Sequence, residues 1–279
     1  MALNKKKLLL LGIGFLTSFI SLNFLKRKFS LNPKLPPVDD NTVLLIQYKY
    51  SPFCLKVSKV MDYKGIPYKT LNLLPLVNKN FIKNISGQEL LPVIKHKGNI
   101  IYDSTEIAKY LDNIYPEPSI YIKDNEDLNN EVLLLEDWAD EIFEPLFGKL
   151  ALMYLLEHPE FINEIEDYNL DIDFIDKNKD KLAPFIVKSM LKNQNTKLED
   201  KTNIKIKARE CLSLVKTKIK NKNFLVGDRL TIADITLASH LSVAKKVPYI
   251  AEDDNYQEIF KWQENIFNLT KRKYAIVNN

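Results

Sequence analysis

The sequence predicts an N-terminal apolar helix, then a mixed α/β domain, then a domain made only of helices. Three observations along the 279 residues predict this order. An uncharged run comes first, short β-forming runs then alternate with helical segments, and finally apolar side chains recur at helical spacing. We expect the boundaries to fall at residues 1–41, 42–122 and 123–279.

Residues 8–25 carry no charge and lie between two basic clusters, Lys5-Lys6-Lys7 and Lys26-Arg27-Lys28. As a helix at about 1.5 Å per residue, this run would be about 27 Å long, just enough to cross the hydrocarbon core of a membrane. A cleaved signal peptide is the alternative, but a basic cluster follows the run where a cleavage site would have small residues. We therefore expect a single-pass membrane anchor, followed by a Pro-rich spacer.

The excess of positive charge belongs to this N-terminal segment. Of the 40 basic and 36 acidic residues, seven basic and two acidic ones lie within residues 1–40, which leaves 33 basic and 34 acidic residues elsewhere. No basic surface for nucleic acid is therefore expected. Cys54, Cys211 and three scattered histidines fit neither a disulfide framework nor a metal site. We expect a reducing compartment, on the cytoplasmic side of the membrane.

A strand followed directly by a capped helix opens the second segment. Val43-Leu44-Leu45-Ile46 is a short apolar run typical of a buried strand, and Ser51-Pro52 combines a favoured N-cap with proline at the first helical position. Gly65 can end this helix. Unpaired backbone N–H groups and the helix dipole favour an anion at such an N-terminus. Because a thiolate is such an anion, this turn is the candidate site.

Three motifs resemble those of glutathione transferases and glutaredoxins. They are Tyr50–Val57 after the first strand, Gly87–Ile94 leading into a cis-proline strand, and Ile100–Leu111, a strand followed by a capped helix. Phe224–Ile235 resembles the C-terminal signature of glutathione transferases, with Thr231 and Asp234 as a structural capping pair. The resemblance implies a thioredoxin-like α/β domain followed by an all-α helical domain, the glutathione-transferase fold, in a family where homodimers are common.

The resemblance also implies a glutathione site. In that family the backbone of the residue before the cis-proline, here Leu91 before Pro92, pairs with the peptide of glutathione. Asp103 and Ser104 then hold its γ-glutamyl end, and Asp103 with Glu106 forms a pair similar to a capping box. Without the resemblance, Pro92 is a turn residue, and Asp103 and Ser104 only begin a helix.

Ser51 is the candidate for activating the thiol. It replaces the first cysteine of the glutaredoxin pattern, so disulfide exchange between two sulfurs is lost. In serine-type transferases a hydroxyl here hydrogen-bonds the glutathione sulfur and favours its ionised form. Cys54, one turn into the helix, either packs as a small apolar residue or, if exposed, forms a mixed disulfide with glutathione. Tyr48 and Tyr50 are alternative hydroxyls.

Two parts of the helical domain bear on function. An apolar stripe between residues 133 and 150 includes Phe147, which either packs in the core or lines an acceptor pocket. Residues 157–203 are rich in charge, which is typical of an insertion or mobile loop, and contain a helix near 182–191.

The first hypothesis is a glutathione-dependent transferase or peroxidase acting on a hydrophobic electrophile, with glutathione as co-substrate and no metal. A membrane tether would suit acceptors that partition into the bilayer. Two alternatives share the fold, namely a membrane-anchored isomerase similar to prostaglandin E synthase and a non-enzymatic docking protein similar to metaxins. Ser51 weakens the first analogy, and the presence of Pro92, Asp103 and Ser104 speaks against the second.

Overall fold

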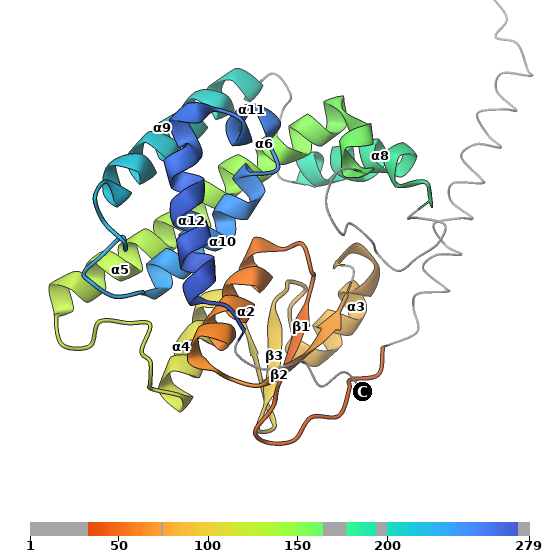
Figure 1. Cartoon of the computed structure of the whole chain (residues 1–279). Coiled ribbons are helices and arrows are strands. Elements are labelled where there is room, and N and C mark those ends of the chain that lie inside the picture. The colour runs from red at the N-terminus through yellow and green to blue at the C-terminus, as the bar shows by residue number, and fades with distance from the viewer. Residues whose placement is uncertain (1–32, 74, 164–176, 194–199, 273–279) are drawn as a thin grey trace, which may run out of the picture.

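The structure is a computed structural model that describes residues 33–73, 75–163, 177–193 and 200–272. The run predicted to be a membrane anchor, 8–25, lies outside these residues. Within them, none of the helices is both long enough and apolar enough to cross a bilayer. The described chain forms a sheet-containing part and a larger helical part, which pack against each other (Figure 1).

A four-stranded sheet forms the first part, with the strand order β2-β1-β3-β4. Strand β1 (Val43–Gln47) is parallel to β2 (Tyr68–Asn72) and antiparallel to β3 (Val93–His96). Strand β3 then pairs in antiparallel fashion with β4 (Asn99–Tyr102). The strand predicted from the apolar run at 43–46 is thus the second of the four and is hydrogen-bonded on both sides.

Helices cover both faces of the sheet. Helices α2 (Pro52–Lys64) and α4 (Ser104–Ile114) lie on one face and α3 (Pro75–Ser86) on the other (Figure 1). Because side chains alternate along a strand, Val43 and Leu45 pack toward α2 and α4, while Leu44 and Ile46 pack toward α3. A strand buried on both faces needs apolar residues at every position, which explains the continuous run.

The predicted start and end of α2 are confirmed. Ser51 is its N-cap, and its Oγ accepts a hydrogen bond from the Cys54 amide at 3.4 Å. Pro52 follows at the first helical position, and Gly65 ends the helix with a φ of 70°, in the left-handed region that glycine adopts without strain. The bond between Leu91 and Pro92 is cis, as the resemblance implied.

The second part is all helical in the described residues. Helix α5 (Glu126–Trp138) continues through a π-helical turn, η1 (Ala139–Phe143), into α6 (Glu144–Glu157). Phe147, on α6, is fully buried, so it packs in the core. The remaining elements are η2 (Pro159–Asn163), α8 (Lys179–Asn193), α9 (Lys201–Ile219), α10 (Ile232–Ala244), α11 (Pro248–Ala251), η4 (Asp254–Tyr256) and α12 (Gln257–Leu269).

Helix α10 is the centre of the helical part and joins it to the sheet domain. It is buried from Ile232 to Leu241 and packs against α2, α5, α6 and α12. Helix α8 lies where a helix was predicted near 182–191. The rest of the charge-rich segment, 164–176 and 194–199, lies outside the described residues.

The predicted capping pair of α10 is confirmed. The fully buried Asp234 carboxylate accepts hydrogen bonds from the Thr231 amide (2.8 Å), the Thr231 hydroxyl (2.9 Å) and the Leu225 amide (2.7 Å). Burial raises the pKa of Asp234 to about 6, although these three hydrogen bonds oppose the rise. Asp234 therefore ties the preceding loop to the helix start and has a structural role.

Replacing Asp234 with alanine should lower the free energy of unfolding by about 2 to 3 kcal/mol, because two buried backbone N–H groups would lose their acceptor. Urea denaturation measures the change. Asp228→Ala is the control, since Asp228 is exposed in the same loop and should change the value by less than about 0.5 kcal/mol. Equal effects of the two substitutions would contradict the structural role.

Candidate functional site

A cleft of about 750 Å³ lies between the start of α4 and the first helices of the helical part. It contains four of the predicted glutathione-binding residues, Leu91, Pro92, Asp103 and Ser104. The other lining residues are Phe53, Gln88, Leu90, Tyr102, Thr105, Glu106, Asp137, Asp140 and Glu141. A second hollow of about 700 Å³, between the end of α9 and α12, contains none of the predicted glutathione-binding or thiol-activating residues.

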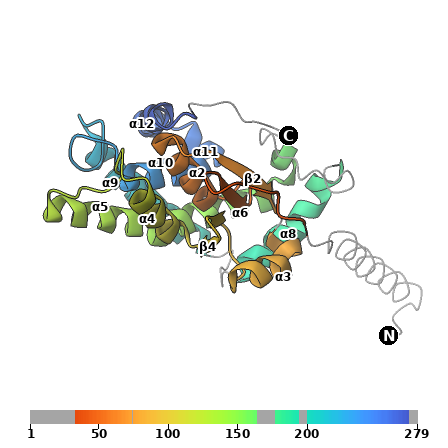
Figure 2. The same ribbon diagram turned by 90° about the horizontal axis from the view of Figure 1, so that it is seen from below.

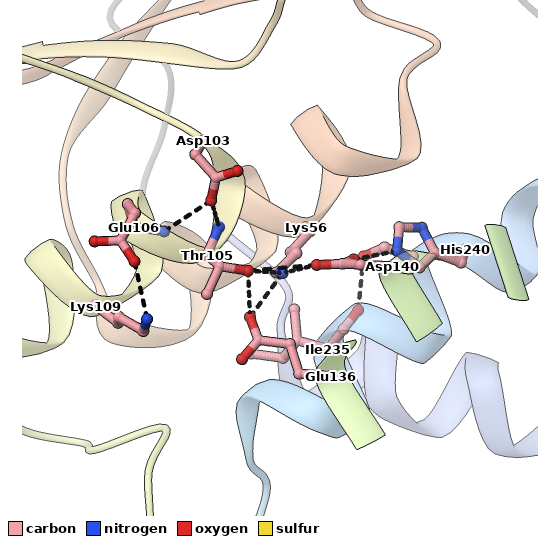
Figure 3. Close-up of polar contacts among 10 residues, drawn as sticks. Lys56, Asp103, Thr105, Glu106, Lys109, Glu136, Asp140, Ile235 and His240 are labelled. Carbon is pink, nitrogen blue, oxygen red and sulfur yellow. Dashed lines mark hydrogen bonds and ion pairs between the residues drawn. The ribbon is translucent and has the colours of Figure 1, made fainter. Parts of the chain in front are cut away.

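The N-terminus of α4 opens into this cleft. Asp103 is its N-cap, and one carboxylate oxygen accepts from the amides of Thr105 (2.9 Å) and Glu106 (3.1 Å) (Figure 3). Asp103 has a φ of 70°, which is costly for a residue with a side chain, and residues strained in this way cluster at functional sites. The Glu106 carboxylate turns toward Lys109 (2.8 Å). The predicted pairing of Asp103 with Glu106 is therefore wrong in one half. Asp103 caps the helix, but the Glu106 carboxylate pairs with Lys109 and not with the Asp103 amide.

Ser104 has an unused hydroxyl at this helix terminus. The residue is only 6% exposed, yet it lines the cleft. Within the described residues, its side chain forms no hydrogen bond. A hydroxyl that faces a cleft beside a helix N-terminus can donate to a bound carboxylate.

Neither Ser51 nor Cys54 is among the described residues that line the cleft. Ser51 is half-buried at the start of α2, and Phe53, two residues further on, is the residue of this turn that contacts the cleft. Cys54 is 1% exposed, and burial raises the pKa of its thiol to about 11. At neutral pH this thiol is protonated and out of reach, which favours packing over the mixed disulfide.

Positive charge gathers beside the start of α2. The rings of Tyr48 and Tyr50 meet edge to face with their centroids 5.5 Å apart. The ammonium groups of Lys49 and Lys246 lie 5.5 and 5.8 Å from the centre of the Tyr50 ring. Burial lowers the pKa of Lys246, which follows α10 and belongs to the helical part. Both parts of the protein therefore place a cation near the residue that precedes Ser51.

A buried ion-pair network, which the sequence analysis missed, adjoins the cleft (Figure 3). Lys56 of α2 is fully buried, and its ammonium lies 2.7 Å from a Glu136 oxygen, 2.8 Å from an Asp140 oxygen and 3.0 Å from the Thr105 hydroxyl. The other Asp140 oxygen lies 2.6 Å from the imidazole Nε2 of His240. The network thus joins α2, α4, α5, the π-helical turn and α10.

Asp140 connects this network to the cleft. Its side chain is 12% exposed and lines the cleft, while Lys56 and His240 lie behind it. Burial raises the pKa of Asp140, but the hydrogen bond from His240 and the charge of Lys56 outweigh it, so the pKa is lowered and the group is ionised at neutral pH. Burial lowers the pKa of His240, which keeps the imidazole neutral.

One sequence signal pointed to this network. Lys56 lies three residues after Phe53 and four before Val60, so it falls on the apolar face of α2. A lysine on a core-facing side of a helix requires a buried acid. Its partners are 80 and 84 residues away in sequence, at Glu136 and Asp140, and no local pattern identifies them.

Comparisons with known proteins agree with this geometry. Residues 45–119 match the profile "Glutathione S-transferase, N-terminal domain" and residues 179–270 match "Glutathione S-transferase, C-terminal domain", together more than half of the chain. A probable glutathione S-transferase of Solanum tuberosum is 24% identical over 229 residues, 80% of this chain and 84% of the relative. Glutathione S-transferase L3 of Arabidopsis thaliana is 31% identical over 94 residues, 32% of this chain and only 40% of the relative.

A solved structure extends the likeness to the whole fold. The glutathione transferase URE2P8 of Phanerochaete chrysosporium, crystallised with oxidised glutathione, has a TM-score of 0.58 and 18% identity. The alignment covers 85% of this chain and 93% of that protein. With both domain profiles matched in order on a thioredoxin-like domain followed by a helical one, the chain belongs to the glutathione S-transferase family.

Proposed function

We propose that this protein is a glutathione-dependent transferase or peroxidase that acts on a hydrophobic electrophile, with Ser51 activating the thiol. Family membership supports glutathione chemistry at a general level. The observation that carries the proposal is the cleft itself. Leu91, Pro92, Asp103 and Ser104 come from separate segments and line one cavity beside the start of α2.

Charges around the cleft suit the γ-glutamyl end of glutathione, which carries a carboxylate and an ammonium on one carbon. The N-terminus of α4 and the unused Ser104 hydroxyl would take the carboxylate. Asp137, Asp140 and Glu141 form an acidic wall across the cleft and would take the ammonium. This end of the ligand therefore finds complementary groups in both domains.

The start of α2 suits the sulfur. Ser51 holds a hydroxyl at a helix N-terminus, and Lys49 and Lys246 bring positive charge to the neighbouring Tyr50. Both features favour the thiolate over the thiol. The thiolate would then attack the electrophilic atom of the acceptor. As the new bond to sulfur forms, the bond from that atom to its leaving group would break, which in a peroxide is the O–O bond, and the departing anion would take a proton from water.

A membrane tether through residues 8–25, with the folded part on the cytoplasmic side, would place this site near acceptors dissolved in the bilayer. A homodimer, as is common among glutathione transferases, is part of the same proposal. The membrane-anchored isomerase is the second candidate, and it requires the same glutathione site.

Binding of glutathione to the full chain, measured by calorimetry, tests the site. Ser104→Ala should weaken binding about tenfold, because a hydrogen bond to a charged group is lost. The melting temperature should not change, since this hydroxyl has no hydrogen bond in the described part of the protein. Ser58→Ala on α2 is the control and should bind normally, because the Ser58 hydroxyl donates to the Leu55 carbonyl of its own helix and Ser58 is not a described lining residue of the cleft.

A wild-type chain that fails to bind glutathione would remove both enzymatic candidates. The docking protein similar to metaxins would then be the better explanation of the fold. An equal loss of binding in Ser104→Ala and Ser58→Ala would place glutathione somewhere other than at the start of α4.

A further inference from the structure

Helix α8 exposes three lysines around a large aromatic side chain. Lys181, Phe185, Lys188 and Lys192 recur at steps of four, three and four residues, so they share one face of the helix, and all four are exposed. Phe185 is 76% exposed. Among the exposed residues between 177 and 192, every charged side chain is a lysine. We call these four residues the α8 face.

The opposite side of α8 is firmly packed. Ala183, Val187 and Leu191 are 3%, 2% and 4% exposed, and the helix lies against α6 and η2. Phe185 is therefore exposed although its helix is packed against the rest of the protein. Within the described residues, the ammonium groups of Lys181, Lys188 and Lys192 have neither ion pairs nor hydrogen bonds. Three positive charges on one face of a helix attract an anionic partner.

The geometry points to an anionic membrane surface as the partner of the α8 face. Basic clusters beside a membrane bind anionic lipid headgroups, and aromatic side chains are favoured at the level of those headgroups. The ammonium groups would meet lipid phosphates and carboxylates, and the Phe185 ring would enter the interface. A soluble polyanion would attract the lysines, but a bilayer accepts the charges and the apolar ring together.

The position of α8 supports the same partner. The uncharged run at 8–25 would hold the chain at a membrane, which raises the local concentration of lipid. In Figures 1 and 2, the red start of the described chain lies in the same right-hand half as α8, and α5 and α9 lie at the opposite end. The inference is independent of the glutathione chemistry, and its test does not involve the cleft.

The electrostatic part has a predictable size. Each lysine near an anionic leaflet strengthens binding by about fivefold. Neutralising Lys181, Lys188 and Lys192 together should therefore weaken the contact by about a hundredfold. The contact should also weaken as salt is added, because these charges face water in the free protein.

The test uses the full chain in vesicles and a fluorescent label on one introduced cysteine. Ser189→Cys places the label beside the α8 face, and Ser213→Cys places it on the exposed surface of α9 as a matched control. The native cysteines, Cys54 and Cys211, are buried and do not compete for the label. Lipids with a spin label in the acyl chain quench any fluorophore at the interface.

With phosphatidylserine in the vesicles, the label at 189 should be quenched and the label at 213 should not. Vesicles of phosphatidylcholine alone should give little quenching at 189, and so should the triple Lys→Gln variant of the α8 face. Extraction with alkaline carbonate, which removes proteins that are not inserted, tests separately whether residues 8–25 are inserted in the membrane. Equal quenching at both positions, equal quenching in both lipids, or no association with the vesicles would each overturn the proposal. If RNA or polyglutamate changes the fluorescence of the label at 189 and vesicles do not, the α8 face binds an acidic macromolecule and the proposal is wrong.

Discussion

Replacing Lys56 with methionine is expected to lower the free energy of unfolding by about 3 to 5 kcal/mol. The lysine is fully buried and holds Glu136 and Asp140 in the interior, so its removal leaves a buried carboxylate without a counter-charge. Denaturant unfolding measures the loss. We also expect weaker glutathione binding, because the same ammonium joins α2 to Thr105 in the first turn of α4.

Two variants separate the buried charge from other causes. Lys109→Met removes an exposed ion pair of similar length, 2.8 Å to Glu106, and should cost at most about 1 kcal/mol. Adding Glu136→Gln to Lys56→Met should recover part of the lost stability, because the buried negative charge is then also removed. If Lys56→Met is no worse than Lys109→Met, the network does not stabilise the contact between the two parts.

Replacing Ser51 with alanine is expected to raise the pKa of the bound glutathione thiol by about one unit or more and to lower kcat/KM at neutral pH by about ten- to hundredfold. A hydroxyl that donates to the sulfur stabilises the thiolate more than the thiol. The wild-type site therefore holds glutathione as the thiolate at pH values below the pKa of free glutathione, and Ser51→Ala should lose this thiolate. Titration of the ultraviolet absorbance of the bound thiolate measures the shift, and activity should recover as the pH is raised.

The controls assign the effect to the hydroxyl. Ser51→Ala also removes the N-cap of α2, which costs about 1 kcal/mol, so the titration is made well below the melting temperature. Cys54→Ala should leave the thiol pKa unchanged, because Cys54 is 1% exposed and packs in the core. An unchanged pKa in Ser51→Ala together with a raised one in Cys54→Ala would assign the activation to the cysteine.

Caps and turn residues in the sequence predicted where individual helices begin and end. Ser51-Pro52 predicted the start of α2, Gly65 predicted its end, and Thr231 with Asp234 predicted the start of α10. Each of these is a hydrogen-bond or backbone preference within a few residues, and such preferences hold in many tertiary contexts. The pairing of Glu106 with Asp103 was not predicted correctly, because Lys109, one turn further on, attracts the same carboxylate.

The site was predicted in part. Leu91, Pro92, Asp103 and Ser104 were identified by motif order and line one cleft. The acidic wall of Asp137, Asp140 and Glu141 was not identified, because in the sequence these carboxylates are ordinary polar positions beside the apolar stripe of residues 133–150. Ser51 was placed at the right helix terminus, yet its neighbour Phe53 has the contact with the cleft.

By itself, the sequence determined the buried strand at 43–46, the starts of α2, α4 and α10, and the order of an α/β part and a helical part. Periodicity, caps and turn residues act over a few positions, and the chain reveals them without its fold. Only the tertiary structure decided that Lys56, Glu136, Asp140 and His240 meet, that Cys54 is inaccessible, and that α8 presents Phe185 to solvent. Those facts depend on contacts between residues far apart in the chain, where burial sets the cost of a charge and packing decides which face of a helix is left uncovered.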